Sequence, residues 1–195
     1  MDKGYFVFAQ GEEYIRLAYA LALSIKNTQK INKICIATGE DDSIPDDYQH
    51  AFDHIIWVKN VGLKYPMANE WQIWDLTPFK ETIHVEADTI FTTNIDWWWD
   101  ELQQHELFFT SKVKDYRGHI ATSNFYRRHF EKKRIPKLYN GFYYFRYSET
   151  AFNFFKKAKE VSARYSHYAK LFFEGAYYPK TPTTDEIFGM TAYLL

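Results

Sequence analysis

Residues 82–91 read TIHVEADTIF, an apolar and β-branched run that ends in two carboxylates separated by one residue. Successive side chains of a strand point to opposite faces, so a strand through this stretch directs Glu86 and Asp88 to the same face. Mg²⁺ and Mn²⁺ prefer oxygen ligands and keep open positions for substrate phosphates. The stretch therefore indicates a metal site for a diphosphate at a strand end. The alternative is a pair of solvated acids.

The first half of the chain alternates short apolar runs with segments of helical periodicity. We expect strands at residues 5–9, 33–38, 54–58 and 81–88, and helices at residues 17–27 and 67–76 with a short one after Pro45. Strands separated by helices are typical of βαβ units and predict an α/β fold with a mostly parallel central sheet. Ligands bind such sheets outside the carboxyl ends of the strands, where Gln10 and residues 86–88 both fall.

The second half has a different character. Strands are expected at residues 106–111 and 139–146, whereas residues 111–138 lack clear periodicity and hold nine Lys and Arg. Ser148 is expected to cap a helix that ends near Arg164, and Thr183 with Glu186 forms a capping-box pattern for a last helix. No linker or repeat divides the sequence. We therefore expect one domain over residues 1–195, with a C-terminal extension that is short or absent.

Composition limits the classes of protein and partner. Hydrophobic residues make up 46% of the 195 residues, which excludes wholesale disorder, and the 20% aromatic residues either fill a core or line a cleft for bases and sugars. A net charge of -1 gives no overall attraction to nucleic acid or an anionic membrane. The single cysteine, Cys35, lies in an apolar run and is expected to be a buried, reduced thiol. We expect a cytoplasmic protein without a transmembrane segment that does not bind nucleic acid.

The order of motifs resembles the GT-A glycosyltransferases of the glycogenin and bacterial galactosyltransferase type, a family 8-like group. Those enzymes carry a D-x-D motif at a strand end, a later N-x-G strand and an Asp-Gln pair that opens a helix. The matching positions here are Tyr14, Trp71, Trp74, residues 85–91, residues 94–96, residues 139–145 and residues 184–186. Each motif is short, so the resemblance depends on their combination and order along nearly the whole chain.

The resemblance implies transfer of a sugar from a nucleotide diphosphate sugar, usually a UDP-sugar, with Mn²⁺ or Mg²⁺ bridging the diphosphate. By motif position, Glu86 and Asp88 are the metal ligands. The residues assigned to the nucleotide are Gln10, Tyr14 and Ala87. The two assigned to catalysis, Asn140 and Asp185, lie against the donor sugar. The acceptor is left open between a glycan, a protein and a lipid-linked sugar.

Four positions depart from the family pattern. Glutamate replaces aspartate at Glu86, and Glu186 replaces glutamine. No basic residue stands near Glu70, where the family places one, although Lys64 is a candidate substitute. The third metal ligand, a C-terminal histidine, has no counterpart before the sequence ends at Leu195. These departures define an alternative to the enzyme: a degenerate, non-catalytic nucleotide-sugar or carbohydrate-binding module of the same fold.

Several features have a structural alternative to their functional interpretation. Tyr14 either stacks on the base or is a core ring of the first helix, and Asp185 either faces the donor sugar or belongs only to a helix cap. The three tryptophans at residues 97–99 cannot all be buried on one face. They form a platform for the acceptor sugar, a hydrophobic plug, or a surface that a further segment covers. The basic residues between 112 and 137 form a solvated face or contact the diphosphate or an anionic acceptor.

Overall fold

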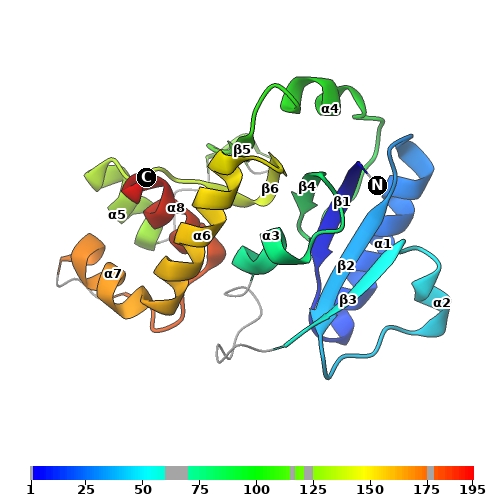
Figure 1. Ribbon diagram of the computed structural model, residues 1–195, viewed down its shortest axis with the longest axis horizontal. Coiled ribbons are helices and arrows are strands. Elements are labelled where there is room, and N and C mark those ends of the chain that lie inside the picture. Colours follow the sequence, from blue (N-terminus) through cyan, green and yellow to red (C-terminus); the bar gives the residue numbers. More distant parts are fainter. Residues whose placement is uncertain (1, 60–69, 115–116, 121–124, 175–177) are drawn as a thin grey trace.

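The central element is a six-stranded sheet with the order β3-β2-β1-β4-β6-β5 (Figure 1). The computed structural model describes residues 2–59, 70–114, 117–120, 125–174 and 178–195. β1 to β4 are parallel, and β6 is antiparallel to both β4 and β5. The strands are β1 (Lys3–Phe8), β2 (Ile34–Gly39), β3 (His54–Val58), β4 (Glu81–Val85), β5 (Leu107–Thr110) and β6 (Tyr139–Arg146). The predicted α/β fold with a mostly parallel sheet is confirmed.

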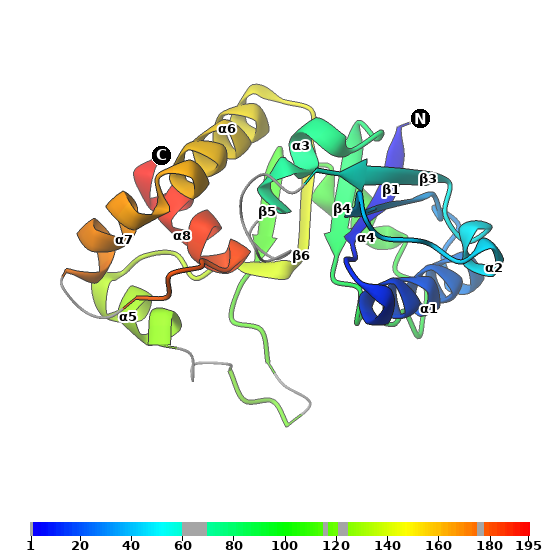
Figure 2. The ribbon, with the colours of Figure 1, turned by 90° about the horizontal axis from the view of Figure 1, so that it is seen from below.

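Helices cover both faces of the sheet (Figure 2). One face packs against α1 and α4, and the other packs against α3, α6 and α8. The helical elements are α1 (Glu12–Thr28), α2 (Asp46–Gln49), the 3₁₀ helix η2 (Glu70–Gln72), α3 (Ile73–Leu76), α4 (Trp97–Leu102), α5 (Phe125–Lys133), α6 (Glu149–Ala163), α7 (Tyr165–Phe173) and α8 (Thr184–Leu194). In the part of the chain that is described, none of these helices is long and apolar enough to cross a membrane.

The two faces have cores of different composition. Strand alternation sends Tyr144 toward α1 and its neighbours Tyr143 and Phe145 toward α6 and α8. The α1 side is mainly aliphatic, whereas on the α6 side Phe155 and Phe188 pack against Tyr143 with ring centroids 6.4 and 5.7 Å apart. Most of the unusual aromatic content therefore serves packing on one face of the sheet.

Close approach of α5 and α8 requires a glycine. A Cβ at Gly189 would lie 2.5 Å from the Phe130 ring and 2.8 Å from the Pro136 carbonyl oxygen. Phe130 is fully buried, so it anchors α5 beside α8. This contact explains how residues 125–133 form a helix in a segment that lacks clear periodicity.

Helix caps and the isolated thiol agree with the sequence. The Ser148 side chain accepts a hydrogen bond from the Ala151 amide, and Thr183 with Glu186 forms the predicted capping box of α8. Cys35 is buried and free. Burial raises the pKa of its thiol to about 12, which is the chemistry of an inert core cysteine.

Some element bounds differ from the prediction, and some helices were not predicted. β4 ends at Val85, not at Asp88, because the chain turns at Glu86, where the Thr89 amide donates to the Glu86 carbonyl over 3.1 Å. The helix predicted at residues 67–76 is a 3₁₀ turn followed by one turn of α3, and residues 67–69 lie outside the described part. Helices α4, α5 and α7 were not predicted.

The tryptophans of α4 have three different environments, as their spacing requires. Trp97 is 59% exposed, and Trp99 is fully buried with its ring 5.4 Å from that of Tyr5. Trp98 lies between these extremes and packs on Phe142, with centroids 5.1 Å apart. Trp99 is therefore a core residue, and only Trp97 offers a ring to a partner.

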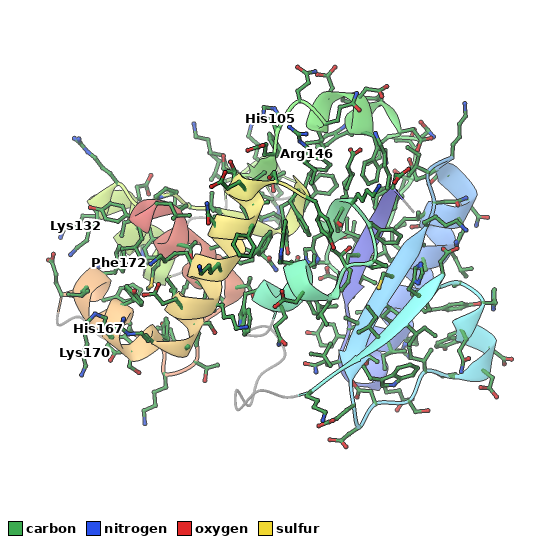
Figure 3. All side chains as sticks on the ribbon, viewed as in Figure 1. His105, Lys132, Arg146, His167, Lys170 and Phe172 are labelled. Atoms are coloured by element: carbon green, nitrogen blue, oxygen red, sulfur yellow. The ribbon has the colours of Figure 1, made fainter. Side chains whose placement is uncertain are left out.

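The described basic residues of the 112–137 segment are partly paired with acids. Lys133 lies 2.5 Å from a Glu174 oxygen and Lys137 lies 3.5 Å from a Glu131 oxygen. Lys132 projects outward from the end of α5 (Figure 3). Ion pairs of this kind are typical of a solvated face.

Candidate active site

Three adjacent strand ends meet at one edge of the sheet. β1 and β4 are parallel with Phe6 opposite His84, so their carboxyl ends lie side by side. β6 is antiparallel to β4 and begins at this same edge, where the Glu86 amide donates to the Gly141 carbonyl over 3.2 Å. The sheet therefore brings the ends of β1, β4 and β6 to the edge at which parallel sheets bind ligands.

The turn after β4 presents the predicted metal pair. Glu86 is half-buried and Asp88 is exposed. The Tyr139 hydroxyl donates to Glu86 Oε2 over 3.1 Å. Because the strand ends at Val85, strand alternation does not orient these carboxylates, and the reasoning from i, i+2 spacing was wrong even though both groups lie at the predicted edge. The turn carries both residues, and the Tyr139 contact orients Glu86.

Tyr139 marks the point at which the predicted site residues gather. Burial raises the pKa of Tyr139 well above its usual value, and the carboxylates of Glu86, Asp185 and Asp88 raise it further. The phenol therefore feels the charge of three acids from the β4 turn and from α8, and it is hydrogen-bonded to one of them, Glu86. Gly141 makes room for this phenol, because a Cβ there would lie 2.4 Å from the Tyr139 ring.

Asn140 and Asp185, the residues assigned to catalysis, are joined directly. The Asn140 amide donates to Asp185 Oδ1 over 2.7 Å. The α8 cap itself is formed by Thr183 and Glu186, whose Oε2 accepts from the Thr183 amide over 2.9 Å. Asp185 thus ties the start of α8 to the start of β6, which is more than the helix-cap interpretation requires.

Glu70 is a member of this cluster that sequence reasoning missed. Its carboxyl accepts hydrogen bonds from the Asn140 side-chain amide and from Thr184. Burial, together with the nearby Glu86 and Asp185 carboxylates, raises the pKa of Glu70 to about 8 against those hydrogen bonds. The only signal in the sequence was an acid where the family pattern has a base. Lys64, the candidate substitute, lies outside the described residues.

The nucleotide side of the predicted site is built around Asp42. Its carboxylate accepts from the Gly11 amide over 3.1 Å and from the Gly39 amide over 2.8 Å, which ties the loop after β1 to the end of β2. Gln10 lies beside Gly39 in this loop. Gly11 has φ 82°, a left-handed conformation that favours glycine, and it leads directly into α1.

Two predicted nucleotide contacts differ in what they can offer a ligand. The Tyr14 ring is 52% exposed on the first turn of α1, so the interpretation of Tyr14 as a core ring is wrong. Ala87 is buried in the core on the α1 side, so its methyl group is covered and only its backbone can face a ligand.

The donor atoms at the β4 turn suit a hard divalent cation. Glu86 and Asp88 supply carboxylate oxygens, and Mg²⁺ is commonly held by one or two carboxylates together with substrate phosphates. Among the described residues, no group of three or more His, Cys, Asp or Glu side chains is arranged to hold a metal ion. His84 is a buried core residue beside Tyr143, and burial lowers its pKa to about 3. A cation at this turn would depend on two protein carboxylates and its substrate.

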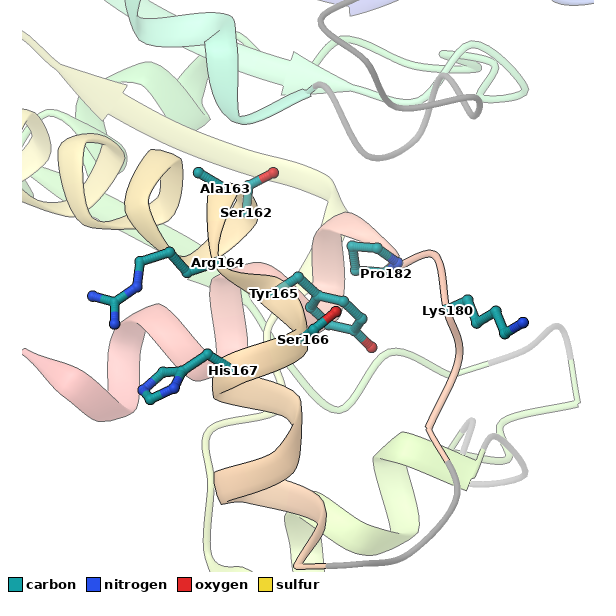
Figure 4. A pocket seen from close by; sticks show the side chains of 8 residues that line it. All are labelled: Ser162, Ala163, Arg164, Tyr165, Ser166, His167, Lys180 and Pro182. Carbon is teal, nitrogen blue, oxygen red and sulfur yellow. The ribbon is translucent and has the colours of Figure 1, made fainter.

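Three cavities open in the helical part of the molecule. Their volumes are 340, 240 and 110 Å³. The first lies where α6 meets α7 and is lined by Ser162, Tyr165 and Pro182, among others (Figure 4). Within the described residues, these three cavities include none of the predicted site residues.

Comparison with known proteins was informative only at the level of structure. Neither a protein-family model nor a curated protein matches the sequence. The galactosyltransferase LgtC, solved in complex with donor and acceptor sugar analogues, superimposes with a TM-score of 0.60 at 10% identity over 96% of this chain and 69% of LgtC. The glycosyltransferase GlyE of Streptococcus pneumoniae TIGR4 gives a TM-score of 0.56 at 14% identity over 97% of this chain and 43% of GlyE.

The chain has the fold of these GT-A glycosyltransferases. The structural side of the resemblance seen in the motifs is thereby confirmed. An active-site mutant of LgtC that carries glutamate in place of glutamine is also similar, with a TM-score of 0.59 at 9% identity over 96% of this chain and 70% of the mutant. Identities this low establish the fold alone, so activity and ligands are matters for a proposal.

Proposed function

We propose that the protein is a metal-dependent glycosyltransferase that takes a sugar from a nucleotide diphosphate sugar, a UDP-sugar, and transfers it to a glycan, protein or lipid-linked acceptor. One observation carries the proposal. In a glycosyltransferase fold, Glu86, Asp88 and Asp185 lie at the ligand-binding edge of the sheet, where the Tyr139 hydroxyl donates to Glu86 and the backbone amide of the next residue, Asn140, donates to Asp185. Clustered acids at such an edge are expected where a cation binds with its substrate.

The proposed cofactor is Mn²⁺ or Mg²⁺, held by Glu86 and Asp88. When bound, the cation acts as a Lewis acid that stabilises the negative charge of the leaving nucleoside diphosphate. The crowding of acids supports this assignment, because Glu86 and Asp185 both raise the pKa of Glu70 and a cation relieves such repulsion. The extra methylene of glutamate at position 86 extends the reach of its carboxylate, and the Tyr139 hydroxyl limits its freedom.

The remaining predicted residues have separate roles in this proposal. Tyr14 stacks its exposed ring on the base, and Gln10 with the backbone of Ala87 contacts the nucleotide. Asn140 and Asp185 face the donor sugar, and their mutual hydrogen bond keeps the two groups in register. Positioning of the sugar relative to the leaving group is the contribution expected of this pair.

A second candidate is a binding module of the same fold without turnover. The observation that favours it is Glu70, an acid at the position where the family pattern has a base. Binding of UDP is expected from both candidates. Release of UDP from a UDP-sugar is expected from the enzyme alone, so a panel of UDP-sugars separates the two.

Heat denaturation with UDP and Mn²⁺ tests the proposal. A ligand that binds only the folded state at about 100 times its Kd stabilises that state by about 2.7 kcal/mol. We expect UDP with Mn²⁺ to raise the melting temperature, and Asp88→Ala to abolish the gain. Asp100→Ala, an exposed aspartate of α4, is the matched control and should retain the gain. A folded protein that UDP does not stabilise, with or without Mn²⁺, would contradict the proposal.

A further inference from the structure

The cavity between the α3 region and α6 shares no residue with the predicted site. α3 and α6 lie next to each other in both views of the ribbon (Figure 1 and Figure 2). The cavity has a volume of 110 Å³, and its walls include Trp71, Trp74, Asp75, Phe152, Lys156 and Lys159. At this size it admits one small ring rather than a drug-sized ligand, for which pockets of about 300 Å³ or more are usual.

The rings at this cavity belong to an aromatic cluster that reaches the surface. The Trp74 ring centroid lies 4.9 Å from that of Tyr147 and 6.1 Å from that of Phe152. Tyr147 and Phe152 are 52% and 45% exposed. Because α6 already buries Phe154 and Phe155, core packing does not account for an aromatic ring on its exposed side. The cluster therefore offers apolar surface to a ligand.

Two lysines of α6 cover part of this surface. Phe152, Lys156 and Lys159 are spaced i, i+4 and i+7, so they share one face of the helix. Lys156 Nζ lies 5.7 Å from the Phe152 ring centroid, and Lys159 Nζ lies 5.6 Å from that of Trp71. Among the described residues, neither lysine forms an ion pair with an acid. Cation–π contacts at exposed sites are weak, so a ligand can displace both side chains.

The combination of rings and charges indicates the chemistry of the ligand. Asp75, Lys156 and Lys159 are all exposed, and all three line the cavity. An apolar group would fill the aromatic surface but would desolvate these charged groups without giving them partners. A pyranose satisfies both requirements. Its C–H groups pack on the negative face of an aromatic ring, and its hydroxyls donate to a carboxylate and accept from an ammonium group.

We infer that this cavity binds one pyranose ring of a glycan. The ring lies on Trp74 and Phe152, and its hydroxyls bond to Asp75 and to one of the two lysines. The inference goes beyond the proposed function, because the site needs neither UDP nor a cation. A glycan is held here whether the protein transfers a sugar or only binds one.

Saturation-transfer NMR in buffer without UDP and metal tests the inference. The probes are the methyl pyranosides of glucose, galactose and mannose, with cyclohexanol as an apolar ring of similar size. A single small ring should bind with a Kd of about 1 mM or weaker. We expect transfer from the protein to the C–H protons of at least one pyranoside, and weaker transfer to cyclohexanol.

Two variants test the two halves of the site, with the pyranoside titrated to saturation in each. Phe152→Ala removes an aromatic contact and should weaken binding about 5-fold. Asp75→Ala removes a charged hydrogen-bond acceptor and should weaken binding about 10-fold. Both side chains are exposed, so both variants should fold.

The matched controls are changes of the same kind on α4. Trp97→Ala removes a ring that is 59% exposed, and Asp100→Ala removes an exposed carboxylate. Because neither residue lines the cavity, both controls should bind the pyranoside as the wild type does.

Three results would overturn the inference. The first is the absence of transfer to every pyranoside. The second is transfer to cyclohexanol alone, which would assign the cavity to an apolar side chain of a partner. The third is undiminished binding in Phe152→Ala and Asp75→Ala, which would place the sugar elsewhere on the protein. Failure of the proposed function is a separate result, because it is measured with UDP and Mn²⁺.

Discussion

The two ends of the central sheet shift the pKa values of their carboxyl groups in opposite directions. At the amino end, Asp53 accepts from Lys26 Nζ over 2.6 Å, from Lys33 Nζ over 2.7 Å and from the Ile34 amide over 3.0 Å. Burial alone would raise the pKa of Asp53, but these donors hold it below its usual value. At the carboxyl end, Glu70 has acids as neighbours, and its pKa is raised to about 8.

Other contacts at the amino end repeat the pattern. Glu81 pairs with Lys3 over 3.5 Å and accepts from the Tyr144 hydroxyl over 2.9 Å. Arg146 Nε donates to the His105 carbonyl over 3.3 Å where the β5–β6 pair ends (Figure 3). The amino end is thus arranged for stability, whereas the carboxyl end accepts electrostatic repulsion, as functional sites commonly do.

The largest expected effect is on turnover. Asp185→Asn keeps an oxygen that accepts from the Asn140 amide but removes a charge from the site, and UDP release should fall by about 100-fold. Asp53→Asn, the same change at the other end, should leave the rate per folded molecule unchanged. Initial rates of UDP release at saturating Mn²⁺ measure both. Equal losses in the two variants would remove the functional distinction between the ends.

The second effect is on stability, and here Asp53→Asn is expected to have the larger effect of the two variants. Asp53→Asn leaves two lysines without their carboxylate and should lower the free energy of unfolding by about 2 kcal/mol, the range of hydrogen bonds to charged groups. Asp185→Asn should change it by less than about 0.5 kcal/mol. Urea denaturation compares the two variants. A larger loss in Asp185→Asn would show that its contact with β6 is mainly structural.

The third effect concerns pH. The pKa of Glu70 is raised in the folded state, so its stabilising contribution is complete below the unfolded value of 4.5 and is lost as pH rises toward about 8. Asp53 behaves oppositely, because its folded pKa lies below 3.8 and its contribution is lost as pH falls through that folded value.

Unfolding free energies of wild type and Glu70→Gln in metal-free buffer isolate the Glu70 contribution. Each pH unit over which only the unfolded state is ionised costs about 1.4 kcal/mol. The difference between the two proteins should therefore change by at least about 1 kcal/mol between pH 5 and pH 8, in favour of the variant at high pH. A constant difference across that window would mean that folding does not raise the pKa of Glu70.

The smallest effect compares two glutamates of the same strand and turn. Glu81→Gln removes a partner of Lys3 and should lower the free energy of unfolding by about 0.5–1 kcal/mol. Glu86→Gln relieves repulsion and keeps an acceptor for Tyr139, so it should leave stability unchanged or raise it by about 0.5 kcal/mol. Thermal melts in metal-free buffer are sufficient, and a larger loss of stability in Glu86→Gln than in Glu81→Gln would contradict the comparison.

Much of the sheet was predictable from the sequence because its strands are continuous apolar runs. β3 was predicted at its observed bounds, and β1 and β2 within two residues. β4 was extended too far because the residues from Glu86 to Asp88 continue its alternation, and alternation does not reveal a turn. α5 was missed because its one fully buried described side chain, Phe130, depends on contact with Gly189 in a distant segment.

The site was only partly predictable. Glu86 and Asp88 were predicted from their spacing, and Asn140 and Asp185 were predicted through the family resemblance. Glu70 could not be found in either way, because its partner Asn140 is 70 residues away in the sequence and the family has no acid there. Contacts of that separation are set by the sheet order, which brings β6 beside β4.

The most direct test of the account is the position of Mn²⁺ in crystals grown with UDP and Mn²⁺. We predict one manganese peak in the anomalous difference map, with oxygens of Glu86 and Asp88 within about 2.5 Å and the UDP phosphates completing its coordination. A map in which UDP is bound and manganese is absent from these two carboxylates would contradict the account.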